Sequence, residues 1–128
     1  MRYIHTMLRT SDLARTRAFL EALGYEQTRE LPHVRDGVQE ATNYFFRLPG
    51  DTTDVEVSVP VAGVVEAQPA WGHVALGVDD IDATLSRLAE HGIEPDAEPY
   101  RVREGGPRLC LLTEPACGHR FELVELQS

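Results

Sequence analysis

Hydrophobic and polar residues alternate along most of the chain, and Pro or Gly separates the alternating runs. Period-two alternation predicts β-strands, here at about 2–10, 25–30, 41–48 and 53–59, and again at about 71–78, 93–98, 108–113 and 119–126. The segment 31–40 contains Pro32 and Gly37 and breaks the alternation. It is predicted to be a polar connection and a candidate lid.

Two stretches follow helical spacing instead. After Asp12, one helical face contains Leu13, Thr16, Leu20 and Leu23. After Asp80, one helical face contains Ile81, Leu85, Leu88 and Ala89. An aspartate side chain can accept the free N–H groups of a first helical turn, and glycine commonly ends a helix in the left-handed conformation. We therefore expect helices that begin at 13 and 81 and end before Gly24 and Gly92.

The two halves of the chain repeat each other. An offset of 68 residues (73 − 5) places His5 on His73 and Asp12 on Asp80. Each half reads as a strand, a helix and three strands. The predicted fold class is therefore α+β: one domain, 1–128, made of two βαβββ modules at about 1–62 and 71–128, with a linker at about 63–70.

Strand alternation also predicts which side chains point away from the helices. In the first and last strands of each module the apolar residues share one face, and ionisable residues share the other. Four of these ionisable residues correspond between the modules: His5, Glu56, His73 and Glu122. Imidazole nitrogens with carboxylate oxygens suit divalent ions such as Ni²⁺, Zn²⁺, Co²⁺, Mn²⁺ or Fe²⁺. Converging carboxylates would otherwise repel each other, so we expect a metal site.

Composition narrows the classes of function. The chain has 128 residues, 42% of them hydrophobic and 26% charged, which is typical of a soluble globular domain. Its net charge of −9 (12 − 21) repels phosphate backbones, and no apolar run approaches the ~20 residues that cross a bilayer. The two cysteines, Cys110 and Cys117, fit neither a disulfide framework nor a zinc clip. We expect a cytoplasmic protein that binds neither nucleic acid nor membranes.

Four segments resemble the glyoxalase I (lactoylglutathione lyase) branch of the vicinal oxygen chelate superfamily. RYIHTMLRTSDL contains His5 and Arg9, DVEVSV contains Glu56, WGHVALGVDDID contains His73 and GHRFELVEL contains Glu122. The resemblance covers nearly the whole chain and implies the vicinal oxygen chelate (glyoxalase/bleomycin resistance/dioxygenase) fold. It also implies a homodimer, in which one chain supplies His5 and Glu56 to the site and the other supplies His73 and Glu122.

The resemblance further implies a reaction, the isomerisation of a thiol hemithioacetal of methylglyoxal or another 2-oxoaldehyde. A carbon-bound proton is removed, an ene-diolate forms, and the proton returns to the neighbouring carbon, which yields a 2-hydroxyacyl thioester and detoxifies methylglyoxal. Glu122 is our first choice as the base, with Glu56 acting from the opposite side. One divalent metal per site is implied, with Ni²⁺ or Co²⁺ favoured over Zn²⁺ or Mn²⁺.

The sequence departs from the family pattern where the thiol would bind. Pro60 stands in place of an asparagine, and Glu104 stands in place of a lysine. Arg9 matches a family residue that pairs with the carboxylate of the thiol, and Arg103 or Arg108 is expected to compensate for the lysine. Glutathione, another low-molecular-weight thiol and a different α-hydroxycarbonyl substrate all stay open.

Two alternative functions also stay open. One is an epimerase that acts beside a thioester carbonyl, and the other is a non-catalytic dimer that binds a small molecule such as an antibiotic. An extradiol dioxygenase fits less well, because a fourth ligand at Glu56 would block the open iron position that oxygen needs. The remaining histidines, His33, His91 and His119, are expected on the surface. The acidic residues Glu94, Asp96 and Glu98 are expected on a solvated edge strand.

Overall fold

The computed structural model describes residues 5–35, 37–63, 73–101 and 104–126. The chain divides into two compact units, of which the first comprises Met1–Ala67 with Pro115–Cys117 and the second comprises Gln68–Glu114 with Gly118–Ser128. No helix in the described ranges has the length and hydrophobicity that a bilayer crossing requires.

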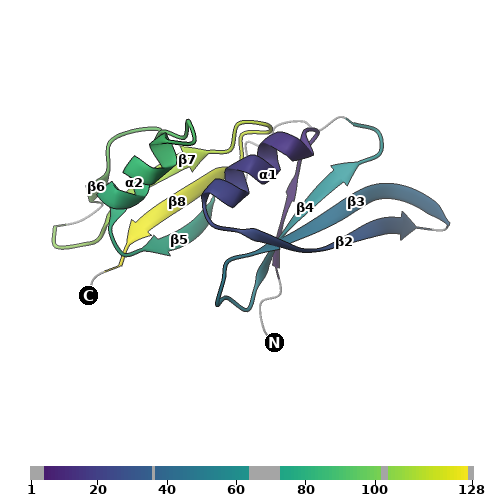
Figure 1. The fold of residues 1–128 in the computed structure, drawn as a ribbon, viewed down its shortest axis with the longest axis horizontal. Helices are drawn as coiled ribbons and strands as arrows, with labels where there is room; N and C mark the ends of the chain where they lie inside the picture. The colour runs from purple at the N-terminus through teal and green to yellow at the C-terminus, as the bar shows by residue number, and fades with distance from the viewer. Residues whose placement is uncertain (1–4, 36, 64–72, 102–103, 127–128) are drawn as a thin grey trace. The chain divides into compact units, whose positions relative to one another are not determined.

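The first unit contains a four-stranded sheet and one helix (Figure 1). Its elements are β1 (His5–Arg9), α1 (Leu13–Ala22), β2 (Glu26–Arg35), β3 (Val38–Arg47) and β4 (Asp54–Pro60). The strand order is β1-β4-β3-β2, in which β1 and β4 are parallel and the other neighbours are antiparallel. This is the predicted βαβββ module.

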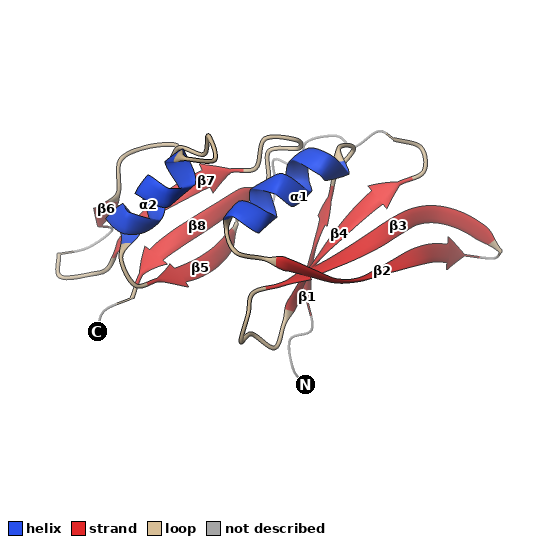
Figure 2. Ribbon diagram, in the orientation of Figure 1, coloured by secondary structure: helices blue, strands red, loops and turns tan. Residues whose placement is uncertain are grey.

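The second unit repeats the same arrangement (Figure 2). It consists of β5 (Val74–Val78), α2 (Ile81–Ala89), β6 (Tyr100–Arg101), β7 (Arg108–Thr113) and β8 (Arg120–Glu125). The order is β5-β8-β7-β6, and the parallel pair is again formed by the first and last strands of the module. The predicted fold class is confirmed.

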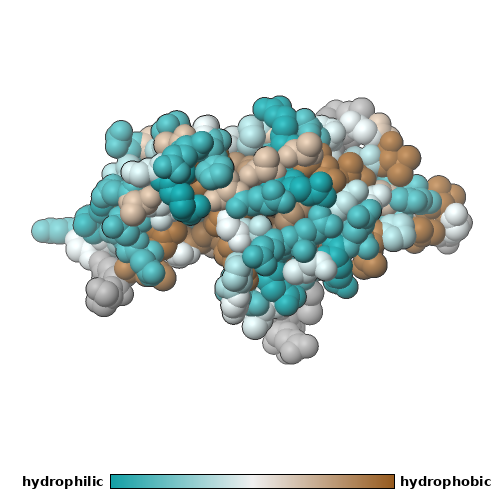
Figure 3. Space-filling view, in the orientation of Figure 1, coloured by the Kyte–Doolittle hydropathy of each residue, from teal (hydrophilic) through white to brown (hydrophobic). Residues whose placement is uncertain are grey.

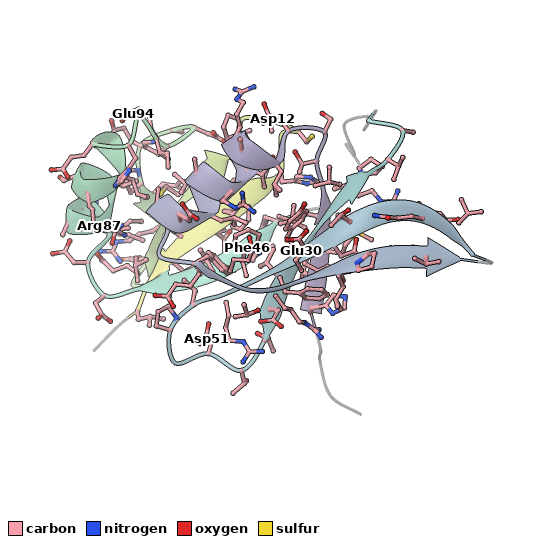
Figure 4. The ribbon with its side chains drawn as sticks, turned by 45° about the vertical axis from the view of Figure 1, so that its right-hand side comes forward. Asp12, Glu30, Phe46, Asp51, Arg87 and Glu94 are labelled. Carbon is pink, nitrogen blue, oxygen red and sulfur yellow. The ribbon has the colours of Figure 1, made fainter. Side chains whose placement is uncertain are left out.

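Both helices begin and end as the sequence predicts. Asp12, seen at the start of α1 in Figure 4, accepts the Arg15 N–H at 3.2 Å, and Asp80 accepts the Ala83 N–H at 2.9 Å. Gly24 and Gly92 follow the helices with φ of 102° and 74°, a conformation that only glycine adopts readily. Each helix start is therefore stabilised by a side-chain acceptor.

Each helix lies against one face of the sheet in its own unit. Arg17 of α1 donates a hydrogen bond to Gln27 on β2 at 2.8 Å, and its guanidinium lies 5.6 Å from the centre of the Tyr44 ring on β3. Phe46, two residues after Tyr44 on the same face of β3, is fully buried. In the second unit the Ile81 N–H of α2 donates to the Glu125 carboxylate on β8. Fully buried residues of the helices and strands form the cores, among them Leu8, Leu20 and Val57 in the first unit and Ile81, Leu88, Leu112 and Phe121 in the second.

The prediction for the segment 31–40 is wrong. Instead of a polar connection, β2 continues to Arg35 and β3 begins at Val38, so the segment is the far end of a long hairpin. Hydrophobic side chains, among them Val34 and Val38, are exposed there (Figure 3). Because β2 is the edge strand, Pro32 needs no hydrogen bond on its outer side, and the strand tolerates it.

The strand predicted at 93–98 is also absent from this described part of the chain. Asp96 attaches the segment to β7 and β8. Its N–H donates to the Leu111 carbonyl at 2.8 Å, and its carboxylate accepts from Thr113 on β7 and Arg120 on β8. Pro95 interrupts the segment and has no N–H for a strand ladder. Glu94, Asp96 and Glu98 are therefore exposed on a loop, and the third strand of the module is the two-residue β6.

His33 and His91 are exposed, as predicted, but the prediction that His119 lies at the surface is wrong. Only 5% of His119 is exposed. Its carbonyl accepts the Glu114 N–H at 2.7 Å, which closes a tight turn before β8. The turn returns the chain toward the sheet, so His119, the residue just before the strand, is covered.

Candidate metal centre

His5 and Glu56 lie side by side in the first unit. Their strands are parallel neighbours, and the register places Met7 beside Glu56, so His5 shares a face with that carboxylate. Nε2 of His5 lies 2.5 Å from Oε2 of Glu56. The Phe45 ring meets the His5 ring edge to face, with centroids 6.1 Å apart, which restricts the orientation of the imidazole.

His73 and Glu122 repeat this arrangement in the second unit. The register places Ala75 beside Glu122, and His73 stands two residues before Ala75, as His5 stands two before Met7. Nε2 of His73 lies 3.4 Å from Oε2 of Glu122. The same strand geometry thus produces one imidazole–carboxylate pair in each unit.

Both pairs lie on the sheet face that is turned away from the helix of their unit. The carboxylates are more covered than the imidazoles: 11% of the Glu56 side chain and 19% of the Glu122 side chain are exposed, against 35% for His5 and 41% for His73. A ligand can therefore approach each imidazole while the sheet supports each carboxylate.

The two pairs fit the ligand set of a divalent metal. Two ligand atoms that each lie about 2.0–2.2 Å from one ion, at a right angle, are about 3 Å apart. The observed Nε2–Oε2 distances of 2.5 and 3.4 Å lie on either side of this value. Within the described ranges, no group of three or more His, Cys, Asp or Glu side chains is arranged to hold a metal ion. Each pair by itself brings together one imidazole nitrogen and one carboxylate oxygen, two donor types that divalent metals accept.

A hollow of about 450 Å³ lies beside Glu56 in the first unit. Arg9, predicted to bind substrate, lines it, and so do Met7 and Ser58 from the strands that carry the pair. Residues that the sequence analysis did not select complete the wall: His33, Glu40, Ala41 and Asn43. Alternation along β3 would have placed Asn43 and Phe45 on this face, but without the observed strand pairing nothing identified that face as the wall of a pocket.

The structure does not bring Arg108 to Glu122. Arg108 shares a face of β7 with the buried Cys110, and its guanidinium donates to both carboxylate oxygens of Asp82 on α2, at 2.8 and 2.9 Å. This pairing lowers the pKa of Asp82 and raises the pKa of Arg108. The Arg108 charge is thus engaged on the helix side of the sheet, and Arg103 lies outside the described residues.

Cys110 is a packing residue of β7. It is 1% exposed, and burial raises the pKa of its thiol. A thiol in such surroundings is kept neutral, which makes it a poor metal ligand or nucleophile.

Known proteins match this chain along most of its length. Residues 4–110 match the family model of the Glyoxalase/Bleomycin resistance protein/Dioxygenase superfamily. The lactoylglutathione lyase of Salmonella typhimurium is 30% identical over 131 residues, which are 98% of this chain and 93% of that protein. The lactoylglutathione lyase of Haemophilus influenzae is 30% identical over 134 residues, which are 100% of this chain and 95% of that protein.

Solved structures agree with these sequence matches. A glyoxalase I mutant from Zea mays superposes with a TM-score of 0.80 and 25% identity, over 99% of this chain and 46% of the maize chain, so this chain spans about half of that enzyme. A trypanothione-dependent glyoxalase I from Leishmania major superposes with a TM-score of 0.74 and 25% identity, over 98% of this chain and 86% of that chain.

Proposed function

We propose that this chain, which belongs to the Glyoxalase/Bleomycin resistance protein/Dioxygenase superfamily and to its lactoylglutathione lyase (glyoxalase I) branch, is a metal-dependent lyase. Its substrate is the hemithioacetal of a thiol with methylglyoxal or another 2-oxoaldehyde, and its product is a 2-hydroxyacyl thioester. One observation carries the proposal: each module holds an imidazole–carboxylate pair in the same strand register.

One divalent ion per site is held by His5, Glu56, His73 and Glu122. Ni²⁺ or Co²⁺ is favoured, with Zn²⁺ or Mn²⁺ as alternatives, because imidazole and carboxylate ligands suit these ions. When bound, the ion supplies positive charge that stabilises the negative oxygens of the ene-diolate. One chain of a homodimer contributes His5 and Glu56 and the other contributes His73 and Glu122; the support is that each unit holds one imidazole–carboxylate pair.

Glu122 moves the proton in this proposal. It takes the hydrogen from the carbon beside the carbonyl and returns it to the neighbouring carbon, so the reaction is an isomerisation with no net gain or loss of electrons. The support is its contact with His73, which at 3.4 Å is longer than a hydrogen bond, whereas Glu56 is held at 2.5 Å. Glu56 acts from the opposite side, and Arg9 binds the anionic end of the thiol.

The proposed setting is the cytoplasm. Cys110 and Cys117 form no disulfide, and reduced thiols persist in a reducing compartment. A reduced low-molecular-weight thiol is also available there to form the hemithioacetal. The partners are this small molecule and a second copy of the chain.

Metal analysis and turnover test the proposal together. Protein incubated with Ni²⁺ or Co²⁺ and then desalted is expected to retain about one equivalent per site and to consume the methylglyoxal–glutathione hemithioacetal. His5→Ala and Glu122→Gln should lose most of the metal or the activity. His91→Ala and Glu94→Gln, which change the same residue types at exposed positions, should retain both.

Two results would contradict the proposal and favour an alternative. Protein that cannot be loaded with any of the four metals points to the small-molecule-binding dimer. Metal-loaded protein that turns over no hemithioacetal, whichever thiol is supplied, points to the epimerase.

A further inference from the structure

Asn43 carries a polar atom whose hydrogen bond is missing. The residue lies in the middle of β3 and is 9% exposed. Its Oδ1 is the one buried side-chain nitrogen or oxygen atom in the described ranges that has no hydrogen-bond partner. Leaving such a group unpaired is energetically unfavourable, so its presence needs an explanation.

The position of Asn43 supplies that explanation. The register pairs Asn43 with Ser58 on β4, and pairs Phe45, two residues further along β3, with Glu56. Because alternate residues of a strand share a face, the carboxamide lies on the same side of the sheet as Glu56. Asn43 also lines the 450 Å³ hollow together with Arg9.

We propose that Asn43 is a substrate-binding residue, whose side-chain carbonyl accepts a hydrogen bond from an N–H group of the thiol portion of the substrate. The inference rests on the proposed function and deepens it, because it selects a class of thiol. Asn43 Oδ1 can only accept, so the ligand must provide a donor. Arg9, on the same wall, attracts an anionic group. A peptide-like thiol, which carries both an amide N–H and a carboxylate, satisfies both residues.

The other ionisable groups of the hollow do not compete for this donor. Glu56 contacts His5 at 2.5 Å, and Glu40 lies 3.6 Å from His33. Each carboxylate therefore already has a cationic or donor neighbour on the protein. A site with a buried acceptor discriminates against ligands that lack the donor, because the acceptor then stays unpaired. Asn43 is thus expected to favour peptide thiols over simple alkyl thiols.

The experiment compares two thiols that differ in this donor. Glutathione contains amide N–H groups, whereas 3-mercaptopropionate has a carboxylate and no N–H. Asn43→Leu should lower kcat/KM for the methylglyoxal–glutathione hemithioacetal about tenfold to hundredfold. It should leave the value for the mercaptopropionate hemithioacetal within about twofold. Tyr44→Phe, on the opposite face of the same strand, should change neither value.

A second pair of variants separates hydrogen bonding from packing. Asn43→Ala and Asn43→Ser leave cavities of similar size, but only serine retains an oxygen that can accept. Asn43→Ser should therefore keep more of the preference for glutathione than Asn43→Ala. Equal losses with both thiols, or equal behaviour of the alanine and serine variants, would overturn the assignment of Asn43.

Calorimetric titration with S-methylglutathione gives a measurement that does not depend on turnover. Weaker binding to Asn43→Leu than to the unaltered protein supports the inference, even if no hemithioacetal is converted and the proposed function fails. Unchanged binding overturns the inference, even if the unaltered protein is an active lyase.

Discussion

The two modules have the same topology but differ in what surrounds their imidazole–carboxylate pairs. In the first module β2 and β3 are ten residues long each, and residues from both line the hollow beside Glu56. In the second, the strand equivalent to β2 is the two-residue β6, and the segment before it is attached through Asp96. The parallel strand pair that holds the ligands is common to both modules, whereas the outer two strands differ.

The pairs themselves also differ. His5 and Glu56 are 2.5 Å apart, and His73 and Glu122 are 3.4 Å apart with a more exposed carboxylate. The contact between the histidine and the glutamate depends on the register of two parallel strands, so it does not require outer strands of equal length. The first module is therefore the one with a hollow beside its pair, and the second has the looser and more exposed pair.

The largest expected effect breaks the functional symmetry of the two glutamates. At saturating metal, Glu122→Gln should lower kcat about 10²- to 10⁴-fold, the usual contribution of a general base, because an amide can still coordinate but cannot take the proton. Glu56→Gln should cost less, since Glu56 is the more firmly held partner. The measurement is kcat with protiated and deuterated methylglyoxal, with metal content determined for each sample. Equal losses would mean that the two carboxylates share the role.

A smaller effect tests whether the cores of the two modules are equivalent. Leu20 in α1 and Leu88 in α2 occupy corresponding positions, and both are 0% exposed. Leu20→Ala and Leu88→Ala should each lower the free energy of unfolding by about 2–5 kcal/mol, measured by urea denaturation. Val61→Ala, at a residue 67% exposed, should change it by less than about 0.5 kcal/mol. A loss at only one leucine would show that the modules do not depend equally on their helices.

The ligand strands could be predicted because they obey the simplest physical rule. Apolar and polar residues alternate along β1, β4 and β8, so the sequence predicts the faces of His5, Glu56 and Glu122, although Glu56 itself is buried with Val55 and Val57. The helix starts were equally accessible, since Asp12 and Asp80 each accept a hydrogen bond three residues further on. These features depend on neighbours in sequence or on one buried face.

The features that were missed depend on contacts between distant residues. The outer half of β2 lies at the edge of the described sheet and pairs there with β3, so it needs no alternating pattern and contains Pro32. The stretch 93–98 looks like a strand, but Asp96 binds Thr113 and Arg120 and holds it as a loop. Arg108 was predicted to bind substrate, but it binds Asp82, which lies 26 residues earlier in the chain, and the sequence pattern does not indicate this contact.

The smallest expected effect concerns how each helix is attached to its sheet. α1 uses Arg17 and the neutral Gln27, whereas α2 uses the ion pair of Asp82 and Arg108. Arg108 lowers the pKa of Asp82 below its ordinary value of 3.8. The pair therefore stabilises the folded state above that value, and the stabilisation is lost as the pH falls through the lowered pKa. The effect is small, because the pair is exposed and screened by salt.

The single Asp82→Asn variant would also remove the attraction between Asp82 and the N-terminus of α2. A double-mutant cycle of Asp82→Asn and Arg108→Met measures the Asp82–Arg108 interaction separately from that attraction. The coupling, obtained from melting temperatures, should be present at neutral pH, weaken in high salt and disappear at a pH below the lowered pKa. The corresponding cycle with Arg17→Met and Gln27→Ala should show no change over the same pH range, because Gln27 does not titrate. A coupling between Asp82 and Arg108 that persisted in acid would mean that packing of the Arg108 stem, rather than charge, attaches α2 to its sheet.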